Sequence, residues 1–392
     1  MSKVKMFFVL ILAVALFASS SNVPKESVQL KLSIFDHIKT SDLLFTHNRG
    51  VYQIKGDGQL IATVQNGERI RCTQFGHQIN VKVQDKHLGS FKEVEFNGTD
   101  YANNLKLKSI KPASQIRIYE DLIRLYVKGN RIAIINEPEL NHYVAGVVES
   151  EVGKNAHIEY YKLQSILCRT YALSNLRRHE EEGFNLCDQV HCQVYNGKSV
   201  ANRDILKATA ATTGLVVIDK KLDLITATFH SNCGGETVNS EDVWSLPMGY
   251  LRGVRDTFCH TEHHAVWTKI IAKKDWKHYL SKKFKVAIHD ESNENWMYHY
   301  EQKNRDVFFS PYDIPLKTIR HDWKLNSTYF SISEKSDSLV FQGKGFGHGV
   351  GLCQEGAMKM ATLGHSYKSI LNHYYLNVNL VNLSALRFVI ED

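Results

Sequence analysis

One carboxyl group in the sequence is placed to suit acid catalysis. Before Glu151, apolar residues recur every three or four positions: Leu140, Tyr143, Val144, Val147 and Val148. This spacing predicts an amphipathic helix with Pro138 just inside its start. At 100° per residue, Glu151 lies within about 20° of Leu140 on the apolar face of this helix. A carboxyl group there loses hydration, so its pKa rises and it can act as an acid near neutrality. The alternative is a glutamate at the helix end that has already turned to solvent.

Four side chains that commonly bind metals stand close together in the sequence. They are His179, Cys187, His191 and Cys192. Two thiols and two imidazoles are ligand types that suit tetrahedral zinc. A disulfide between Cys187 and Cys192 is the alternative, and both interpretations stay open.

Two polar loops follow further along the chain. In Phe229–Glu236, His230 cannot serve Ser231 as a base, because neighbours on a strand point to opposite faces, so a substrate loop is the better interpretation. The loop Gly343–Ala357 is rich in glycine but lacks the spacing of nucleotide-binding loops, so we expect no nucleotide cofactor. Its glycines allow close backbone approach to a ligand, with His348 pointing into the site. Cys259 is a candidate to bridge back to Cys233.

Composition and charge restrict the class of protein. With 392 residues, 43% hydrophobic residues and 6 prolines, the chain is expected to form two or three globular domains. Its 48 Lys and Arg exceed its 41 Asp and Glu by 7. This net positive charge is spread too thinly for a dedicated nucleic-acid binder, but it allows an anionic polymer as partner. The 7 cysteines are too few for a disulfide-stapled scaffold, and their odd number leaves at least one thiol free, metal-bound or paired to another molecule.

The first residues have the features of a signal peptide. Lys3 and Lys5 precede an apolar run from Met6 to Phe17, and small residues follow it. We therefore expect residues 1–21 to be removed, with cleavage near Ser20, and the product to be exported to a periplasm, cell wall or extracellular space. An uncleaved membrane anchor is the alternative.

The remaining chain divides by its hydrophobic period. Residues 22–125 alternate with period two and contain turn signals, which predicts a small β-rich domain, a sheet or barrel of hairpins. Residues 126–392 mix helices and strands, with further helices over Ile158–Arg178 and about Asn202–Thr213. A hairpin of Leu215–Ile218 and Leu224–His230 is expected after them. The fold class is therefore α+β, with a mixed antiparallel sheet.

Taken in order, these segments resemble the stage II sporulation protein D family, also called the SpoIID/LytB domain family, whose members act on bacterial peptidoglycan. The resemblance covers residues 126–392. It rests on seven segments: Glu137–Glu151, Leu163–Ala172, Cys187–Tyr195, His230–Gly235, Asp242–Trp244, Tyr250–Val254 and Gly343–Ala357.

The resemblance implies a lytic transglycosylase that cleaves peptide-stripped glycan strands and leaves 1,6-anhydromuramic acid ends. Glu151 is its implied acid and base, and a single acid suffices because the nucleophile is the sugar's own 6-hydroxyl. Candidates for positioning the substrate are Arg169, Tyr195, His230, Ser231 and His348. The resemblance also favours zinc at the segment from His179 to Cys192, and it does not by itself imply sporulation.

Two other functions remain open. The first is a non-catalytic protein that binds glycan and enhances a cell-wall amidase. The second is a zinc hydrolase that uses the Cys/His cluster.

Overall fold

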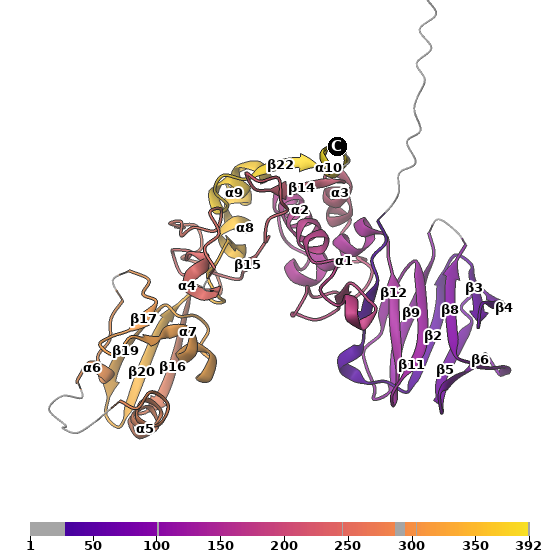
Figure 1. The fold of residues 1–392 in the computed structure, drawn as a ribbon, viewed down its shortest axis with the longest axis horizontal. Coiled ribbons are helices and arrows are strands. Elements are labelled where there is room, and N and C mark those ends of the chain that lie inside the picture. Colours follow the sequence, from indigo (N-terminus) through magenta and orange to yellow (C-terminus); the bar gives the residue numbers. More distant parts are fainter. Residues whose placement is uncertain (1–27, 100–101, 245, 287–294, 303, 391–392) are drawn as a thin grey trace, which may run out of the picture.

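The computed structural model describes residues 28–99, 102–244, 246–286, 295–302 and 304–390. The predicted signal peptide, residues 1–21, lies outside these ranges. None of the helices within them is long and apolar enough to span a membrane. The described chain buries three hydrophobic cores, which follow one another from the N-terminal strands to the region around β20 (Figure 1).

The alternating N-terminal sequence forms twelve of the thirteen strands in two sheets, and residues 186–187 add the last strand, β13. The strands are β1 (Leu32–Ile34), β2 (Asp42–Arg49), β3 (Tyr52–Gly56), β4 (Gln59–Val64), β5 (Arg69–Phe75), β6 (Gln78–Val83), β7 (Lys86–Phe91), β8 (Glu93–Gly98), β9 (Asn104–Lys111), β10 (Arg117–Tyr119), β11 (Leu122–Lys128), β12 (Arg131–Glu137) and β13 (Leu186–Cys187). A short 3-10 turn, Asp36–Ile38, follows β1. The sheet orders are β13-β1-β12-β11-β8-β3-β4 and β10-β9-β2-β5-β6-β7.

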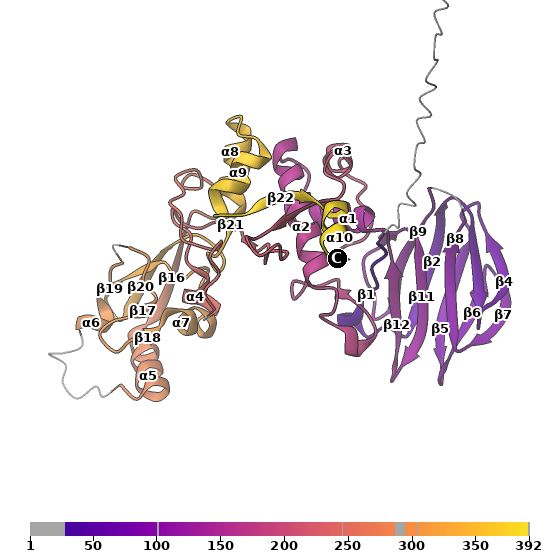
Figure 2. The same cartoon turned by 45° about the horizontal axis from the view of Figure 1, so that its top comes forward.

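The two sheets pack face to face as a sandwich (Figure 2). Alternate residues of each strand point inward, and the rings of Phe45 on β2 and Phe96 on β8 stack across the gap with centroids 4.3 Å apart. The expected small sheet of hairpins is therefore a sandwich with a shared core. It also extends past the predicted domain boundary at residues 125–126, because β11 spans that point and pairs with both β8 and β12.

Three helices follow the sandwich: α1 (Leu140–Val152), α2 (Ile158–Ser174) and α3 (Arg203–Ala211). Each begins with a side-chain cap. The Glu139 carboxylate accepts the Asn141 amide at the start of α1, and the Asn202 side chain accepts the Asp204 amide at the start of α3. The three predicted helices are confirmed. The second ends earlier than predicted, at Ser174, because Asn175 leaves helical geometry and its side chain donates to the Tyr171 carbonyl.

Helix α2 lies between two cores, so it is buried nearly all round. Its residues in the first core are Tyr161, Cys168 and Ala172, and those in the second are Tyr160, Leu163, Ile166 and Leu167. Figure 1 shows α2 between the sandwich and the helices α8 (Gln354–Thr362) and α9 (Tyr367–Tyr374). An amphipathic stripe could satisfy only one of these cores, which explains why the α2 sequence is apolar on most of its surface.

The second core combines segments that lie far apart in the sequence. They are β14 (Leu215–Ile218), β15 (Phe229–His230), α4 (Ser240–Trp244), β21 (Leu352–Cys353), α8 (Gln354–Thr362), α9 (Tyr367–Tyr374) and β22 (Asn379–Asn382). Helix α10 (Leu383–Ile390) follows β22. The predicted hairpin after Leu215 is confirmed only next to its turn, where Ile218 bridges Leu224 and the Ile225 amide donates to the Val217 carbonyl. Instead, β14 pairs with β22 and β15 pairs in parallel with β21, because these partners complete the second core over α2.

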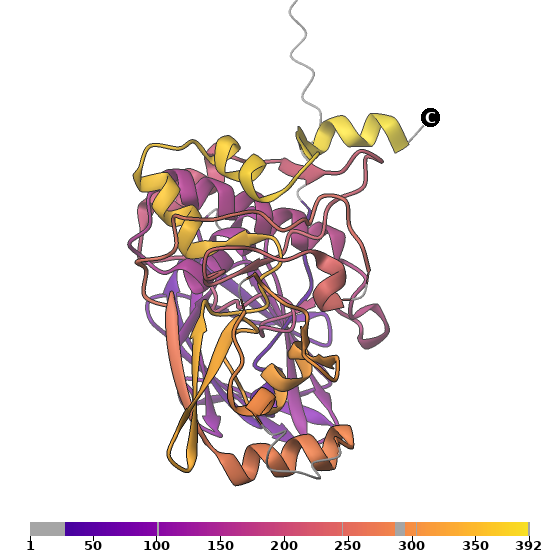
Figure 3. The same ribbon diagram turned by 90° about the vertical axis from the view of Figure 1, so that its left-hand side faces the viewer.

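The third core belongs to the chain between α4 and β21. Its elements are β16 (Val266–Ala272), α5 (Lys273–Phe284), α6 (Asn295–Tyr298), β17 (Phe308–Phe309), β18 (Ile314–Pro315), α7 (Leu316–Asp322), β19 (Phe330–Lys335) and β20 (Ser338–Lys344). A three-stranded sheet of order β16-β20-β19 packs with α5, whose Trp276 is fully buried. Figure 3 shows α5 far from α9 and α10. Helices packed with mixed and antiparallel sheets confirm the α+β class.

Truncating α2 inside the second core should destabilise the protein strongly. Leu167→Ala removes a fully buried side chain, and we expect it to lower the free energy of unfolding by about 2–5 kcal/mol. The control is Leu206→Ala on α3, whose side chain is 47% exposed and should cost less than about 0.5 kcal/mol. Urea midpoints measure both variants, and equal midpoints would contradict the central position of α2.

Candidate functional site

Glu151 lies at the last turn of α1, half-buried, and its carboxylate faces the segment that follows Cys192. The amide of Val194 donates to its Oε1 at 2.8 Å. Val152, the next residue, packs against both the first and the second core. Glu151 therefore stands where the two cores meet, and it has not turned to solvent.

The last turns of α1 are bound to residues 193–201 at several points. The Tyr143 hydroxyl donates to Gln193, and the Asn196 amide donates to the Ser150 hydroxyl at 3.1 Å. The two chains also touch closely, since a Cβ at Gly146 would lie 2.2 Å from the Gly197 carbonyl oxygen. The position of Glu151 is therefore fixed relative to this segment.

Glu149 has a different environment, although it is only two residues from Glu151. Its carboxylate accepts from the Ser199 hydroxyl at 2.8 Å and from the Val200 and Ala201 amides at 3.1 and 2.9 Å. These three donors come from the loop at residues 199–201. Glu149 thus binds the loop at residues 199–201, whereas the Glu151 carboxylate accepts one hydrogen bond, from the Val194 amide.

Burial raises the pKa of Glu151 above its ordinary value, and the hydrogen bond from Val194 opposes that rise without cancelling it. Desolvation disfavours the carboxylate because water no longer solvates its charge. A raised pKa is what a carboxyl group needs in order to act as an acid catalyst.

Arg169 and Tyr195, two predicted positioning residues, are buried and committed to internal contacts. The Arg169 guanidinium donates to Asn141 on α1 at 3.0 Å and to the Leu215 carbonyl at 3.2 Å, and burial lowers its pKa to about 10. The Tyr195 hydroxyl donates to Asn136 at the end of β12. Both side chains join elements around α1.

The four predicted metal ligands converge. The donor atoms of His179, Cys187, His191 and Cys192 all lie within 4.8 Å of one another. The Cys192 sulfur is 3.4 Å from His179 Nε2 and 3.8 Å from His191 Nδ1, and the Cys187 sulfur is 3.9 Å from His191 Nδ1. Both cysteines are free thiols.

A metal at this cluster would have the expected geometry. Around tetrahedral zinc, sulfur and nitrogen ligands lie about 3.3–3.8 Å apart. The other ring nitrogen of His179 is held by the Glu182 carboxylate at 2.6 Å, a second contact that metal-bound histidines commonly have. The residues therefore fit zinc.

His230 and His348 lie together where β15 meets the glycine-rich loop. Their ring centroids are 5.4 Å apart, and His348 also lies 5.3 Å from the ring of Trp244. Burial lowers the pKa of both histidines, that of His348 to about 4, so both rings are neutral at pH 7. The Nε2 of His230 is buried without a hydrogen-bond partner. Trp244 is 40% exposed, which gives this pair an aromatic neighbour that solvent can reach.

Ser231 follows His230 at a bend, and its carbonyl accepts the Glu355 amide. Phe229, before His230, packs against the first and second cores, as Val152 does next to Glu151. Within the described chain, no hydrogen bond joins Glu151 to His230, Ser231 or His348. The two groups of predicted residues therefore flank the same junction, and no hydrogen bond of the described chain links them.

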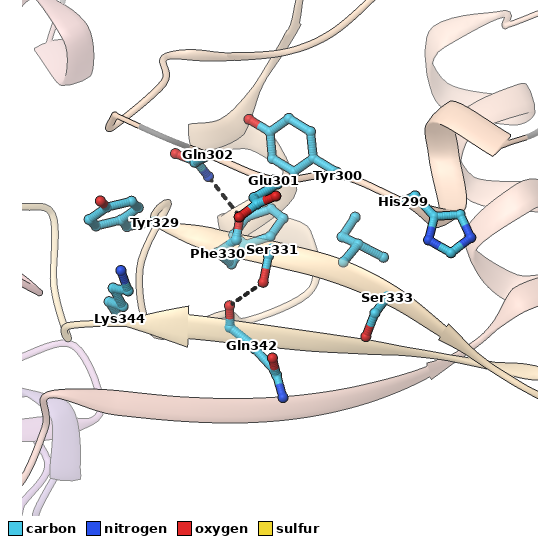
Figure 4. Close-up of a pocket in the computed structure, with 11 residues that line it drawn as sticks. His299, Tyr300, Glu301, Gln302, Tyr329, Phe330, Ser331, Ser333, Gln342 and Lys344 are labelled. Carbon is cyan, nitrogen blue, oxygen red and sulfur yellow. Dashed lines mark hydrogen bonds between the residues drawn. The ribbon is translucent and has the colours of Figure 1, made fainter.

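A cavity of about 600 Å³ lies apart from these groups, in the region of the third core (Figure 4). It opens beside β19 and β20, where Tyr300, Tyr329 and Lys344 line it. Gln302 spans one side by donating to the Phe330 carbonyl at 3.0 Å. None of the predicted site residues lines this cavity.

The sequence did not reveal two parts of this arrangement. The Val194 amide is a backbone group, so no residue type marks it. Asp256 lies beside the sulfurs of Cys233, Cys259 and Cys353, and all four residues are buried. Asp256 stands only three residues before Cys259 in the sequence, and this spacing could have indicated that the two side chains lie together.

The raised pKa of Glu151 predicts a pH dependence of stability. The folded state binds this proton more tightly than the unfolded state, so stability falls as the pH rises from the ordinary glutamate pKa of about 4.3 to the folded pKa. Glu151→Gln removes this contribution. As the pH rises through that window, we expect the urea midpoint of Glu151→Gln to increase relative to the midpoint of the parent. A difference that is constant from pH 4 to pH 7 would contradict a raised pKa.

Comparisons with known proteins agree on one family. Residues 128–218, from the end of β11 through β14, match the model of the SpoIID family, described as Stage II sporulation protein. The chain is 28% identical over 344 residues to an uncharacterized protein of Brachyspira hyodysenteriae, covering 86% of this chain and 88% of that protein.

Two relatives from Bacillus subtilis carry functional names. Stage II sporulation protein D is 27% identical over 299 residues, which cover 71% of this chain and 85% of that protein. Amidase enhancer is 26% identical over 292 residues, which cover 60% of this chain and 40% of that protein. Together with the family match, these relatives support assignment of the chain to the SpoIID/LytB domain family.

Proposed function

We propose that this protein acts on the bacterial cell wall as an exported lytic transglycosylase that cleaves peptide-stripped glycan strands. The relatives named Stage II sporulation protein D and Amidase enhancer support the cell-wall role. The observation that carries the enzymatic proposal is the half-buried Glu151, whose pKa is raised and whose carboxylate is held by one backbone amide.

Glu151 would act twice in this reaction. As the protonated acid, it donates its proton to the glycosidic oxygen as the bond to muramic acid breaks. As the resulting carboxylate, it takes the proton from the 6-hydroxyl of the same sugar, which closes the 1,6-anhydro ring. The proton lost in the first step is thereby recovered in the second, and no water is consumed.

The surroundings of Glu151 suit a mechanism with one acid. Glycosidases that use water or a covalent intermediate generally need a second carboxyl group about 5–9.5 Å away. The nearby carboxylate of Glu149 accepts three hydrogen bonds from residues 199–201, so it is committed to the loop. An internal hydroxyl nucleophile needs no such partner.

The other predicted residues divide into two roles under this proposal. Arg169 and Tyr195 position α1 and thereby Glu151, because their polar groups bond to protein. His230, Ser231 and His348 flank the same junction, and neutral imidazoles next to the exposed ring of Trp244 suit the hydroxyl groups and apolar faces of sugars. Residues 1–21 would direct export to the compartment that holds peptidoglycan.

Zinc at His179, Cys187, His191 and Cys192 would have a structural role. Four protein ligands fill a tetrahedral shell and leave no position for water, which argues against a zinc hydrolase. The ion would hold the segment that includes Val194, two residues after Cys192. The amide that contacts Glu151 would therefore depend on this cluster for its position.

A non-catalytic role as an enhancer of a cell-wall amidase is the second candidate. The similarity to Amidase enhancer supports it. Under this alternative, the same surface would bind glycan strands without cleaving them.

The decisive variant for the enzymatic proposal is Glu151→Gln. It keeps the size and one hydrogen-bond acceptor of the side chain but cannot supply the proton. We expect the rate of release of anhydro-ended fragments from peptide-stripped glycan strands to fall by a factor of about 10² to 10⁴, measured by mass spectrometry. Asp204→Asn, which changes an exposed carboxyl group on α3, is the matched control and should retain activity.

Three results would count against this assignment. Full activity in Glu151→Gln would exclude Glu151 as the acid. Reducing-ended fragments from the parent would indicate hydrolysis. No fragments from either protein, together with stimulation of an added amidase, would favour the enhancer.

Metal removal tests the Cys/His cluster. We expect replacing both Cys187 and Cys192 by Ser to remove one bound zinc per chain and to lower the melting temperature, because the fold around residues 187–195 loses a cross-link. Elemental analysis and thermal melts measure the two effects. Unchanged zinc content in the double variant would contradict the assignment.

A further inference from the structure

A second group of metal-binding side chains lies in the second core, apart from the Cys/His cluster. It consists of Cys233, Asp256, Cys259 and Cys353, and we refer to it as the Cys₃Asp cluster. All four residues are buried, and one donor atom from each lies within 4.8 Å of the others. The Cys/His cluster uses none of these residues.

The distances inside the Cys₃Asp cluster suit one small ion. The sulfurs of Cys233 and Cys259 are 3.4 Å apart, and the Cys233 sulfur is 3.3 Å from an Asp256 carboxylate oxygen. Around tetrahedral zinc, two sulfurs lie about 3.8 Å apart and a sulfur and an oxygen about 3.5 Å apart. The observed spacings fall within about 0.4 Å of these values, so small side-chain movements would complete the shell.

The Cys353 sulfur accepts hydrogen bonds from outside the set of four ligands. Two backbone amides, those of Cys233 and Gly356, point at the Cys353 sulfur at 3.3 and 3.4 Å. Cys353 is also the N-cap of α8, where the helix dipole favours negative charge. Burial by itself raises the pKa of the Cys353 thiol, so a bound cation would be needed to keep a thiolate at this position.

Asp256 is oriented from outside the cluster, as a metal-binding carboxylate commonly is. The Tyr374 hydroxyl donates to its Oδ2 at 2.9 Å, and the Phe258 amide donates to its Oδ1 at 2.9 Å. Together with the Cys233 thiol, its partners are all uncharged donors. A buried carboxylate with neutral partners pays a desolvation cost that a nearby cation would offset.

We propose that the Cys₃Asp cluster binds one Zn²⁺ ion. Three thiolates select a soft or borderline metal, and four protein ligands leave no open position, so the ion would be structural. It would join three separate segments: the turn after β15, the loop at residues 256–259, and the junction of β21 and α8. Because Cys233 lies three residues after His230, the same ion would hold the loop of His230 and Ser231 in place.

A disulfide between Cys233 and Cys259 is the competing arrangement. It would require the two sulfurs to approach to about 2.05 Å. It would also leave the Cys353 sulfur and the Asp256 carboxylate without a charged partner, although both converge on the same point. A metal ion satisfies all four groups, which is why we favour it.

The test uses the full chain in a background that lacks the first cluster, with Cys187 and Cys192 both replaced by Ser. After loading with Zn²⁺ and dialysis under reducing conditions, we expect one zinc per chain by elemental analysis. Loading with Co²⁺ instead should give an absorption spectrum with sulfur-to-cobalt charge-transfer bands. Adding Cys259→Ser should remove the bound metal, whereas adding Cys72→Ser, which changes a buried thiol of the sandwich, should leave it in place.

The proposal does not depend on the activity of the protein, because the readout is metal content. If Cys259→Ser prevents folding, the cobalt spectrum of the background protein still decides the question, and Asp256→Asn provides a milder variant that should weaken zinc binding at least tenfold. A background protein that binds no metal would overturn the proposal. So would a Cys233–Cys259 disulfide found by non-reducing peptide mapping of protein purified without reductant.

Discussion

The burial of α2 on all sides is the constraint on which the rest of this structure depends. One side of the helix completes the core of the β-sandwich, and the other completes the core built from the C-terminal segments. Its polar groups must then bond to neighbouring elements, since water cannot reach them. Arg169 does so with Asn141 and Leu215, and the Thr170 hydroxyl accepts the Val217 amide. These bonds fix α1 and β14 relative to α2.

The placement of α1 determines where Glu151 lies. The helix begins at the end of β12, packs on α2, and is bound along its last turns by residues 193–201. Its final residues stand at the junction of two cores, which is dry enough to raise the pKa of a carboxyl group and open enough to leave Glu151 half-buried. Two glutamates only two residues apart thereby acquire different properties: Glu149 supports a loop, and Glu151 remains available for a proton.

Both clusters of cysteine lie on segments with little regular structure. Residues 187–195 contain a two-residue strand, and the loop at residues 231–239 is held mainly by isolated bridges. Short irregular segments bury few apolar side chains, so they need other means to keep one conformation. Cross-links through thiols and imidazoles or carboxylates would supply this order. They would act on the two segments that carry Val194 and His230, both of which flank the junction of the cores.

The sequence alone determined the elements whose residues follow one period. Alternation predicted the N-terminal strands, the three- and four-residue spacing predicted α1 to α3, and helical phase placed Glu151 on the buried face of α1. The local grouping of His179, Cys187, His191 and Cys192 also identified their convergence. Tertiary structure decided what depends on partners distant in the chain. The predicted hairpin forms only next to its turn, because β15 pairs with β21 instead of with β14. Asp256 joined three cysteines only when β15, β21 and α8 came together. Periodicity reports which face of an element is buried, but the partner that covers it is selected by the packing of the whole chain.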